Sequence, residues 1–348
     1  MKWILSIDGG GIRGIIPAST LVALEQQIGK PVRECFDFLA GTSTGALISA
    51  ALAAGVPATR ILEIYTQRAD EIFTPPKFIA DAKRFVEGYS YDPANIRRVL
   101  ESEFGAAATW VLNNSPVRLL LTAKGIDTHA WYFVRDNPKN KGTTGGLGLI
   151  DCAVASASAP TYFSPWTIDI GGNPVVLVDG GVGVAGNPAY QACVEAFYYD
   201  DFTPTETRVV SLGTGFFPPG NKVPKGLIGW VEWTVGALLD APEEQQTELV
   251  QRHFPGILQR FDWELPHAID MADTSAIPEL VAIGQKAAAG MDWKQTEFAH
   301  RKRGNRLGRC SLRRGGASPR ELRLPRSARV PLPACHTASY PWQPPVRT

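Results

Sequence analysis

A serine flanked by glycines is the residue group in this sequence best suited to chemistry. Gly41 and Gly45 lie two residues on either side of Ser43, which matches the G-x-S-x-G pattern of a nucleophile elbow. The pattern lies between the apolar run Phe36–Ala40 and the alanine-rich run Ala46–Ala54, so it fits a strand-to-helix turn. Such a turn would hold the hydroxyl over a helix N-terminus, whose dipole favours a developing anion. A serine that only caps a helix in a tight turn is the alternative.

Three consecutive glycines, Gly9, Gly10 and Gly11, follow the apolar run Trp3–Ile7. Glycines after a strand can aim several backbone N–H groups at one point, and this nest would suit a phosphate or a tetrahedral oxyanion. With Gly14 they also match the weak dinucleotide pattern G-x-G-x-x-G. A dinucleotide site requires an acidic residue at the end of the second strand, whereas the second predicted strand runs into the serine turn. The sequence therefore favours the oxyanion interpretation.

Asp179 is the candidate base for the serine. It follows the apolar run Val175–Val178 and precedes Gly180 and Gly181, so we expect it at the carboxyl edge of a parallel sheet. The ordinary pKa of an aspartate, about 3.9, makes it a weak base, and burial would raise that pKa. A simple Asp-Gly turn is the alternative. The five histidines have no comparable glycine-rich strand end beside them: His129, His253, His267, His300 and His336.

Predicted strands and helices alternate around these residues. We expect strands over Trp3–Ile7, Phe36–Ala40, Val117–Thr122, Trp131–Val134, Val175–Val178 and Arg208–Leu212. We expect helices over Ile15–Ile28, Ala46–Ala54, 57–72, 93–104 and Ile150–Ala157, the first with Pro17 in its first turn and Gly29 at its end. This alternation predicts an α/β domain with a mainly parallel central sheet flanked by helices.

Composition divides the chain into a body, residues 1–299, and a tail, residues 300–348. The whole chain has 348 residues and a net charge of +1, yet residues 301–348 hold 12 Lys/Arg and one acidic residue. The tail is rich in Arg, Pro, Gly and Ser without apolar periodicity, which predicts disorder. It is either a basic arm or a dispensable appendage. Its basic residues are not interleaved with aromatic ones, so no nucleic-acid partner is expected.

The sequence also indicates a location for the protein. The apolar run at the N-terminus stops at Asp8, too early for a secretory signal, and the longest apolar run, Ala46–Val56, is shorter than a bilayer span. We therefore expect a cytoplasmic protein, peripheral to a membrane if it contacts one. The five cysteines are scattered, odd in number and without C-x-x-C spacing, which fits a reducing compartment and disfavours a zinc site: Cys35, Cys152, Cys193, Cys310 and Cys335.

Taken together, these motifs resemble those of the patatin-like phospholipase family over nearly all of residues 1–215. The segment Asp8–Gly14 resembles the oxyanion block of that family, Gly41–Gly45 resembles its nucleophile elbow, and Asp179–Gly181 resembles its catalytic aspartate block. Two further stretches resemble family signatures: Ala155–Pro160 with Tyr162 and Phe163, and Ser211–Gly215.

The resemblance implies a three-layer patatin-like fold in which residues 1–299 form the acyl hydrolase domain. It also implies a Ser43–Asp179 dyad without histidine, which cleaves phospholipid or neutral acyl esters through a covalent acyl-enzyme without a metal or cofactor. Arg13 matches the family arginine and either orders the glycine loop or touches substrate. The remaining implied site residues are the oxyanion-hole glycines Gly9, Gly10 and Gly11, and the supporting glycines Gly41, Gly45, Gly180 and Gly181.

Two other functions stay open beside lipid acyl hydrolysis. One is a catalytically quiet storage or binding protein on the same scaffold, which the intact serine, aspartate and glycine loop disfavour. The other is a phospholipase effector of bacterial defence that a cyclic nucleotide activates, as some bacterial relatives are. An aromatic stretch is either a lip that meets lipid or part of the core; it comprises Phe216, Phe217 and residues 226–239 with Trp230 and Trp233.

Overall fold

The computed structural model describes residues 1–73, 88–127, 129–137, 144–182, 186–218, 223–226 and 244–295. All of these residues belong to one compact unit, Met1–Arg301. The tail and residues 227–239 of the aromatic stretch lie outside the described residues. The boundary at residue 299, the disorder of the tail and the role of Trp230 and Trp233 therefore stay predictions.

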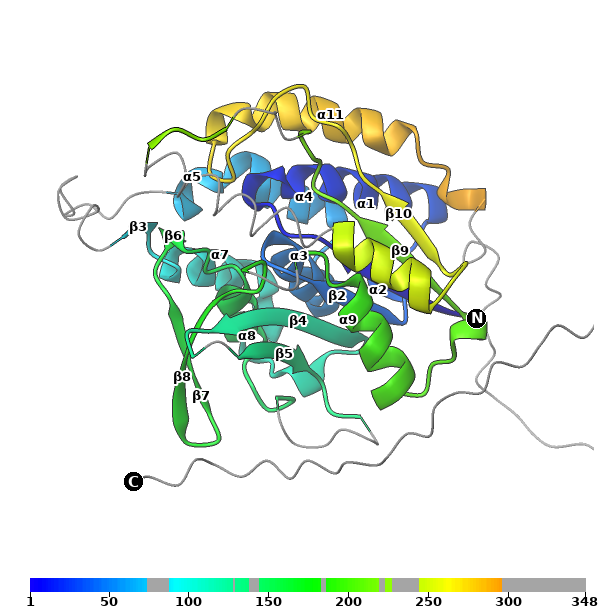
Figure 1. Ribbon diagram of the computed structural model, residues 1–348, viewed down its shortest axis with the longest axis horizontal. Helices are drawn as coiled ribbons and strands as arrows, with labels where there is room; N and C mark the ends of the chain where they lie inside the picture. The colour runs from blue at the N-terminus through cyan, green and yellow to red at the C-terminus, as the bar shows by residue number, and fades with distance from the viewer. Residues whose placement is uncertain are drawn as a thin grey trace, which may run out of the picture. The chain divides into compact units, whose positions relative to one another are not determined.

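A sheet of eight described strands forms the middle of this unit, in the order β10-β9-β1-β2-β4-β8-β7 with β5 paired to β4 (Figure 1). Neighbouring strands from β10 to β4 run parallel, whereas β5, β8 and β7 pair antiparallel with their neighbours. The mainly parallel sheet is thus confirmed. The strands are β1 (Lys2–Ile7), β2 (Phe38–Gly41), β4 (Arg118–Gly125), β5 (Ala130–Val134), β7 (Trp166–Ile170), β8 (Asn173–Asp179), β9 (Thr207–Leu212) and β10 (Leu258–Phe261).

Helices cover both faces of this sheet, which is why the inner strands are apolar at nearly every position. Because side chains alternate along a strand, Leu5 of β1 packs in a core with α1, α3, α8 and α11, and Ile4 packs in a second core with α9. Figure 1 shows α11 and α1 side by side along one face. These helices are α1 (Ile15–Ile28), α3 (Thr44–Ala54), α8 (Leu149–Ser156), α9 (Ala189–Val194) and α11 (Ile277–Ala289). The three-layer α/β architecture is confirmed.

Most predicted elements agree with the structure to within a few residues, and two differ for local reasons. Helix α1 has the predicted bounds, and Gly29 ends it in the left-handed conformation with φ 69°. The helix predicted over 57–72 is instead two helices, α4 (Ala58–Gln67) and α5 (Ala69–Ile72), because Arg68 leaves the helical conformation at φ −120° and ψ 8°. Strand β2 begins two residues later than predicted, because a short helix, α2 (Val32–Cys35), ends just before Phe36.

Strand β8 runs antiparallel to β4, so Asp179 does not reach the carboxyl edge of the parallel strands as the end of one of them. The register explains why Asp179 still reaches the catalytic edge. Asp179 pairs with Ala123 of β4, and Gly41 at the end of β2 pairs with Leu121. Ser43 is two residues beyond Gly41, as Ala123 is two residues beyond Leu121, so Ser43 and Asp179 lie at the same level. Because β4 extends past the end of β2, an antiparallel neighbour can bring its last residue to the carboxyl edge of the parallel strands.

A smaller parallel sheet and one more helix complete the region beside this edge. Strand β3 (Tyr89–Tyr91) pairs with β6 (Thr161–Phe163). Helix α7 (Ala94–Phe104) follows β3 and packs against α8 and α5. None of β3, β6, β7, β10, α9 and α11 was predicted from the sequence.

Candidate active site

The turn between β2 and α3 holds Ser43 in a strained conformation. Its backbone has φ 54° and ψ −122°, and only Ser43 and Thr161 have positive φ among the described non-glycine residues. Such a conformation costs about 1–3 kcal/mol and is often found at functional sites. A Cβ atom on Gly45 would lie 2.1 Å from the Ile7 carbonyl oxygen, and one on Gly41 would lie 2.1 Å from the Gly45 carbonyl oxygen. The two glycines of the motif are therefore required by backbone contacts.

Ser43 and Asp179 are in direct contact. The Ser43 hydroxyl donates a hydrogen bond to the Asp179 carboxylate, and the Gly181 N–H donates a second one at 2.7 Å. Asp179 is only 1% exposed. Burial raises the pKa of Asp179 from 3.8 to about 6, although both hydrogen bonds lower it. Gly180 allows the close turn, since a Cβ atom there would lie 2.6 Å from the Thr122 carbonyl oxygen.

The glycine loop lies against the same serine, but its three N–H groups are not equivalent. A Cβ atom on Gly9 would lie 3.3 Å from the Ser43 Cβ. However, the Gly9 N–H donates to the Gly186 carbonyl oxygen at 3.0 Å. Within the described residues, no acceptor bonds the N–H of Gly10 or Gly11, and Gly11 lines a cavity together with Ser43. In this structure the Gly9 N–H is therefore already bonded, whereas those of Gly10 and Gly11 are not. The oxyanion hole itself stays a prediction.

Arg13 ties the glycine loop to the turn after β9. Its Nε donates to the Gly10 carbonyl oxygen and its Nη1 donates to the Gly215 carbonyl oxygen, both at 3.3 Å. From the same turn, the Thr214 hydroxyl donates to the Gly9 carbonyl oxygen at 2.6 Å. The sequence left two roles open for Arg13, and these contacts favour the one in which it orders the glycine loop.

A buried ion pair, which sequence reasoning missed, anchors the start of the loop. Asp8 is fully buried, and its Oδ2 lies 2.6 Å from Nη1 of Arg260 in β10. Arg260 also pairs with Asp262 at 2.6 Å, and Asp262 accepts a hydrogen bond from the Gly215 N–H at 3.0 Å. Burial raises the pKa of Asp8 to about 7, although Arg260 lowers it. The sequence motifs near this pair were Asp8–Gly14, which contains Asp8, and Ser211–Gly215. Nothing pointed to Arg260, since β10 was not predicted.

An apolar cavity opens at Ser43. Its walls come from the serine turn, α4, α5, α7, β6 and the loop after β10, and the sequence pointed to few of these residues in advance. Tyr162 and Phe163 were quoted only as a family signature. The lining residues are Gly11, Ile12, Ser43, Thr44, Leu47, Tyr65, Ala69, Ile72, Phe73, Ile96, Ala157, Ala159, Tyr162, Phe163 and Met271.

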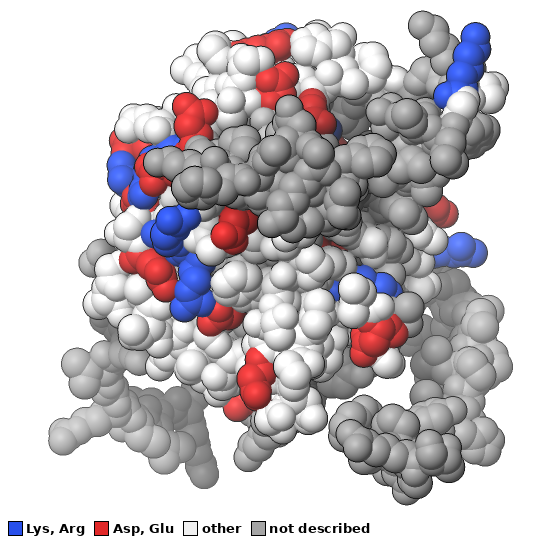
Figure 2. Space-filling view, turned by 90° about the vertical axis from the view of Figure 1, so that its left-hand side faces the viewer, with Lys and Arg blue, Asp and Glu red and all other residues white. Residues whose placement is uncertain are grey.

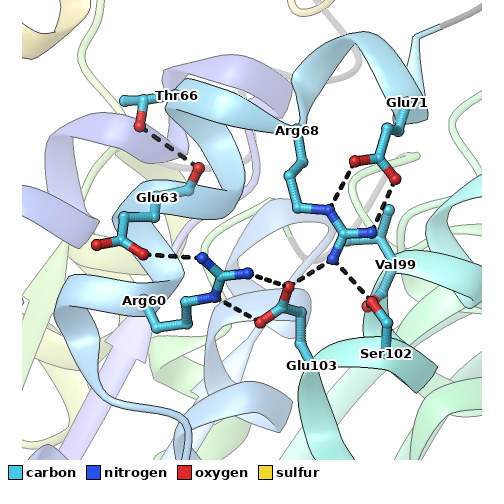
Figure 3. Close-up of polar contacts among 8 residues, drawn as sticks. All are labelled: Arg60, Glu63, Thr66, Arg68, Glu71, Val99, Ser102 and Glu103. Atoms are coloured by element: carbon cyan, nitrogen blue, oxygen red, sulfur yellow. Dashed lines mark hydrogen bonds and ion pairs between the residues drawn. The ribbon is translucent and has the colours of Figure 1, made fainter.

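A cluster of ion pairs joins the helices that form one wall of this cavity (Figure 3). Glu103 of α7 has a side chain that is 7% exposed, and it pairs with Arg60 of α4 at 2.7 Å and with Arg68 at 2.5 Å. Arg68 also pairs with Glu71 of α5 at 2.7 Å. Figure 2 shows acidic and basic side chains next to one another on the side of the molecule that carries α5. The cluster therefore connects α4 and α5 to α7. These three helices together contribute Tyr65, Ala69, Ile72 and Ile96 to the cavity wall.

The three described histidines lie away from this site. His129 pairs with Asp127 at 3.0 Å, the Nδ1 of His253 lies 2.9 Å from the Tyr190 hydroxyl, and His267 pairs with Glu279 at 3.1 Å. None of them lines the cavity at Ser43. His300 and His336 lie outside the described residues.

The described residues were also compared with the requirements of a metal site and of a membrane-spanning helix. No group of acidic, histidine or cysteine side chains in the described part of the chain has the arrangement of a metal site. In the same part, no helix combines the length and the apolar character needed to span a membrane. Phe216 and Phe217, from the predicted lip, are 46% and 44% exposed, so this part of the stretch is not core.

The fold and the site together define a class of protein. It is a three-layer α/β domain in which a G-x-S-x-G turn lies beside a buried aspartate. Within that class, the model of the family described as "Patatin-like phospholipase" matches residues 5–193, which is more than half of the chain. The chain belongs to the patatin-like phospholipase family and, as a member, is a lipid acyl hydrolase. The resemblance inferred from the motifs is thus confirmed.

Named relatives and a solved structure are similar over much of the chain. A "cGAMP-activated phospholipase" of Vibrio cholerae is 27% identical over 82% of this chain and 90% of its own length. "Patatin-like protein 2" of Arabidopsis thaliana is 30% identical over 78% of this chain and 75% of its own. The crystal structure of VipD from Legionella pneumophila is 11% identical with a TM-score of 0.43, over 83% of this chain and 66% of that chain.

Proposed function

We propose that this protein cleaves carboxylic ester bonds of lipids with Ser43 as nucleophile and Asp179 as its base. The observation that carries the proposal is the hydrogen bond between the Ser43 hydroxyl and a fully buried aspartate whose pKa is raised to about 6. Burial gives the carboxylate the basicity that an exposed aspartate lacks. Ser43 also lines an apolar cavity, where an acyl chain would be held.

The reaction would proceed in two acyl-transfer steps. Asp179 takes the Ser43 proton as the hydroxyl oxygen attacks the ester carbonyl, and the carbonyl oxygen becomes an oxyanion. The N–H groups of Gly10 and Gly11, with the N-terminus of α3, stabilise that charge. The leaving alcohol takes the proton from Asp179 and departs, leaving an acyl-enzyme. Water, deprotonated by Asp179, then releases the fatty acid and restores Ser43.

The pH dependence of hydrolysis is the first expected result. Asp179 must be ionised to accept the proton, and its pKa is about 6. The value of kcat/KM should therefore fall about tenfold per pH unit well below pH 6 and reach a plateau above it. A pH–rate profile on a soluble ester checks this, since it avoids pH effects on lipid surfaces. An acid limb near pH 4, where an exposed carboxylate titrates, would contradict the role of the buried group.

The direct test of the proposed function combines substrates with active-site labelling. A panel of p-nitrophenyl esters and phospholipids should be hydrolysed by the wild-type protein, with release of free fatty acid. A fluorophosphonate probe should form one covalent adduct, at Ser43, and peptide mapping by mass spectrometry would locate it. Hydrolysis without any adduct at Ser43 would overturn the nucleophile assignment. Adduct formation without hydrolysis of any lipid would favour the storage or binding alternative.

A second candidate concerns regulation and is favoured by one comparison. The Vibrio cholerae relative named as cGAMP-activated aligns along 90% of its own length, so the similarity is not confined to the catalytic motifs. We propose that a cyclic dinucleotide increases the hydrolytic rate of this protein as well. Hydrolysis of one phospholipid should be measured with and without cGAMP, with cAMP as the matched control. Equal rates in all three conditions would exclude cGAMP as an activator.

A further inference from the structure

The turn at the end of α8, Ser156 to Ser158, contacts both members of the dyad. The Ser156 Oγ accepts a hydrogen bond from the Ser43 N–H at 2.9 Å, and the Ser158 carbonyl oxygen accepts one from the Asp179 N–H at 3.0 Å. Ser156 and Ser158 are both fully buried. One short segment therefore binds the backbone of the nucleophile and the backbone of the base.

We infer that Ser156 is a positioning residue, whose hydroxyl holds Ser43 in its attacking conformation. This inference rests on the proposed role of Ser43 as nucleophile. Ser43 is the N-cap residue of α3, with φ 54°, so its N–H takes no part in the hydrogen bonds of the helix and needs another acceptor. The Ser156 hydroxyl oxygen is that acceptor, and it comes from a residue 113 positions later in the chain.

The physical reason for a catalytic effect is the strain at Ser43. A non-glycine residue at positive φ persists only when surrounding contacts hold it there. Removing the Ser156 oxygen would leave the buried Ser43 N–H without an acceptor, and the turn would relax toward conformations in which that N–H is satisfied. The Ser43 hydroxyl would then spend less time on Asp179. Ser156 is not among the cavity-lining residues, so substrate binding itself should change little.

Ser49 of α3 offers a matched control. Its side chain is as buried as that of Ser156, but its hydroxyl donates to the Ala40 carbonyl oxygen of β2 at 3.2 Å. Ser49→Ala and Ser156→Ala therefore delete the same group at the same burial. Only Ser156→Ala removes a bond to a catalytic residue.

The experiment compares Ser156→Ala, Ser156→Thr and Ser49→Ala with the wild-type full chain, on a soluble ester across the pH range. We expect Ser156→Ala to lower kcat by roughly 10- to 100-fold, the effect of leaving a buried donor unpaired, with KM and the acid limb near pH 6 unchanged. Labelling of Ser43 by the fluorophosphonate should slow in parallel. Ser156→Thr, which restores the hydroxyl, should recover most of the rate, and Ser49→Ala should keep kcat within about threefold.

Three outcomes would overturn the inference. They are a folded Ser156→Ala with kcat within about threefold of wild type, a Ser49→Ala that loses as much as Ser156→Ala, and a folded Ser156→Thr that recovers nothing. If Ser156→Thr does not fold, Ser156→Cys takes its place, and a rate no higher than that of Ser156→Ala would count against the inference. Failure of the proposed function is distinct, because the wild-type protein would then form no adduct at Ser43.

Discussion

Ser43→Ala should fold as the wild-type protein does and lose roughly 10⁴- to 10⁶-fold in kcat, as expected when a covalent nucleophile is removed. Alanine keeps the Cβ atom and the backbone N–H that bonds Ser156, and it lacks only the oxygen that forms the acyl-enzyme. The substitution should not raise KM, because the cavity walls are unchanged. The measurement is ester hydrolysis at pH 8, together with thermal unfolding to verify the fold.

Ser49→Ala is the matched control for this variant. Ser49 is a second buried serine of α3, and its hydroxyl donates to the Ala40 carbonyl oxygen at 3.2 Å. Its loss should cost some stability while kcat stays close to wild type. A Ser43→Ala protein that still forms the fluorophosphonate adduct, or hydrolyses esters at the rate of Ser49→Ala, would show that another residue attacks.

Asp179→Asn should abolish turnover about as completely as Ser43→Ala. Asparagine fits the same space and can still accept the Gly181 N–H, but it cannot take the serine proton, and no other described titratable group contacts the Ser43 hydroxyl. In a Ser–His–Asp triad, the aspartate only orients a histidine, so histidine substitution is the comparably severe change. Here His129→Ala, His253→Ala and His267→Ala should each keep most of the activity. A folded histidine variant as inactive as Ser43→Ala, beside an active Asp179→Asn, would reverse the assignment of the base.

The pH dependence of the stability of Asp179→Asn distinguishes a loss of catalysis from a loss of the fold. The pKa of Asp179 is raised from 3.8 to about 6 in the folded protein. Its protonated form is therefore favoured by folding, and its ionisation lowers the free energy of unfolding as the pH rises from about 4 to 6. This difference between the pKa values of Asp179 in the unfolded and folded protein corresponds to roughly 3 kcal/mol. Asp179→Asn avoids this ionisation, so it should unfold at a higher temperature than wild type at pH 8, with the difference shrinking toward pH 4.

Local sequence was enough to predict a candidate nucleophile, a candidate base and the glycine loop, but not the cavity walls or the Asp8–Arg260 ion pair. The elbow around Ser43 could be predicted because the glycines at 41 and 45 are required by backbone contacts that any such turn makes. The glycine loop could be predicted because it follows an apolar strand, and the carboxyl ends of parallel strands gather at one edge. Asp179 could be predicted from the Asp-Gly-Gly that follows an apolar strand, but its antiparallel strand reaches that edge only because β4 extends past the end of β2. Helix α1 could be predicted at both ends because a proline and a glycine mark them.

The sequence by itself therefore determined the α/β class, the family and the candidate nucleophile, base and glycine loop, because each depends on residues close together in the chain. Tertiary structure alone decided how they meet. The antiparallel pairing of β8 with β4 brings Asp179 to the same level of the sheet as Ser43. The Gly9 N–H donates its hydrogen bond to the Gly186 carbonyl oxygen. The hydrogen bond from Ser43 to Ser156 spans 113 positions. Such contacts depend on strand order and on which helix packs beside which strand, and local propensity carries no information about either.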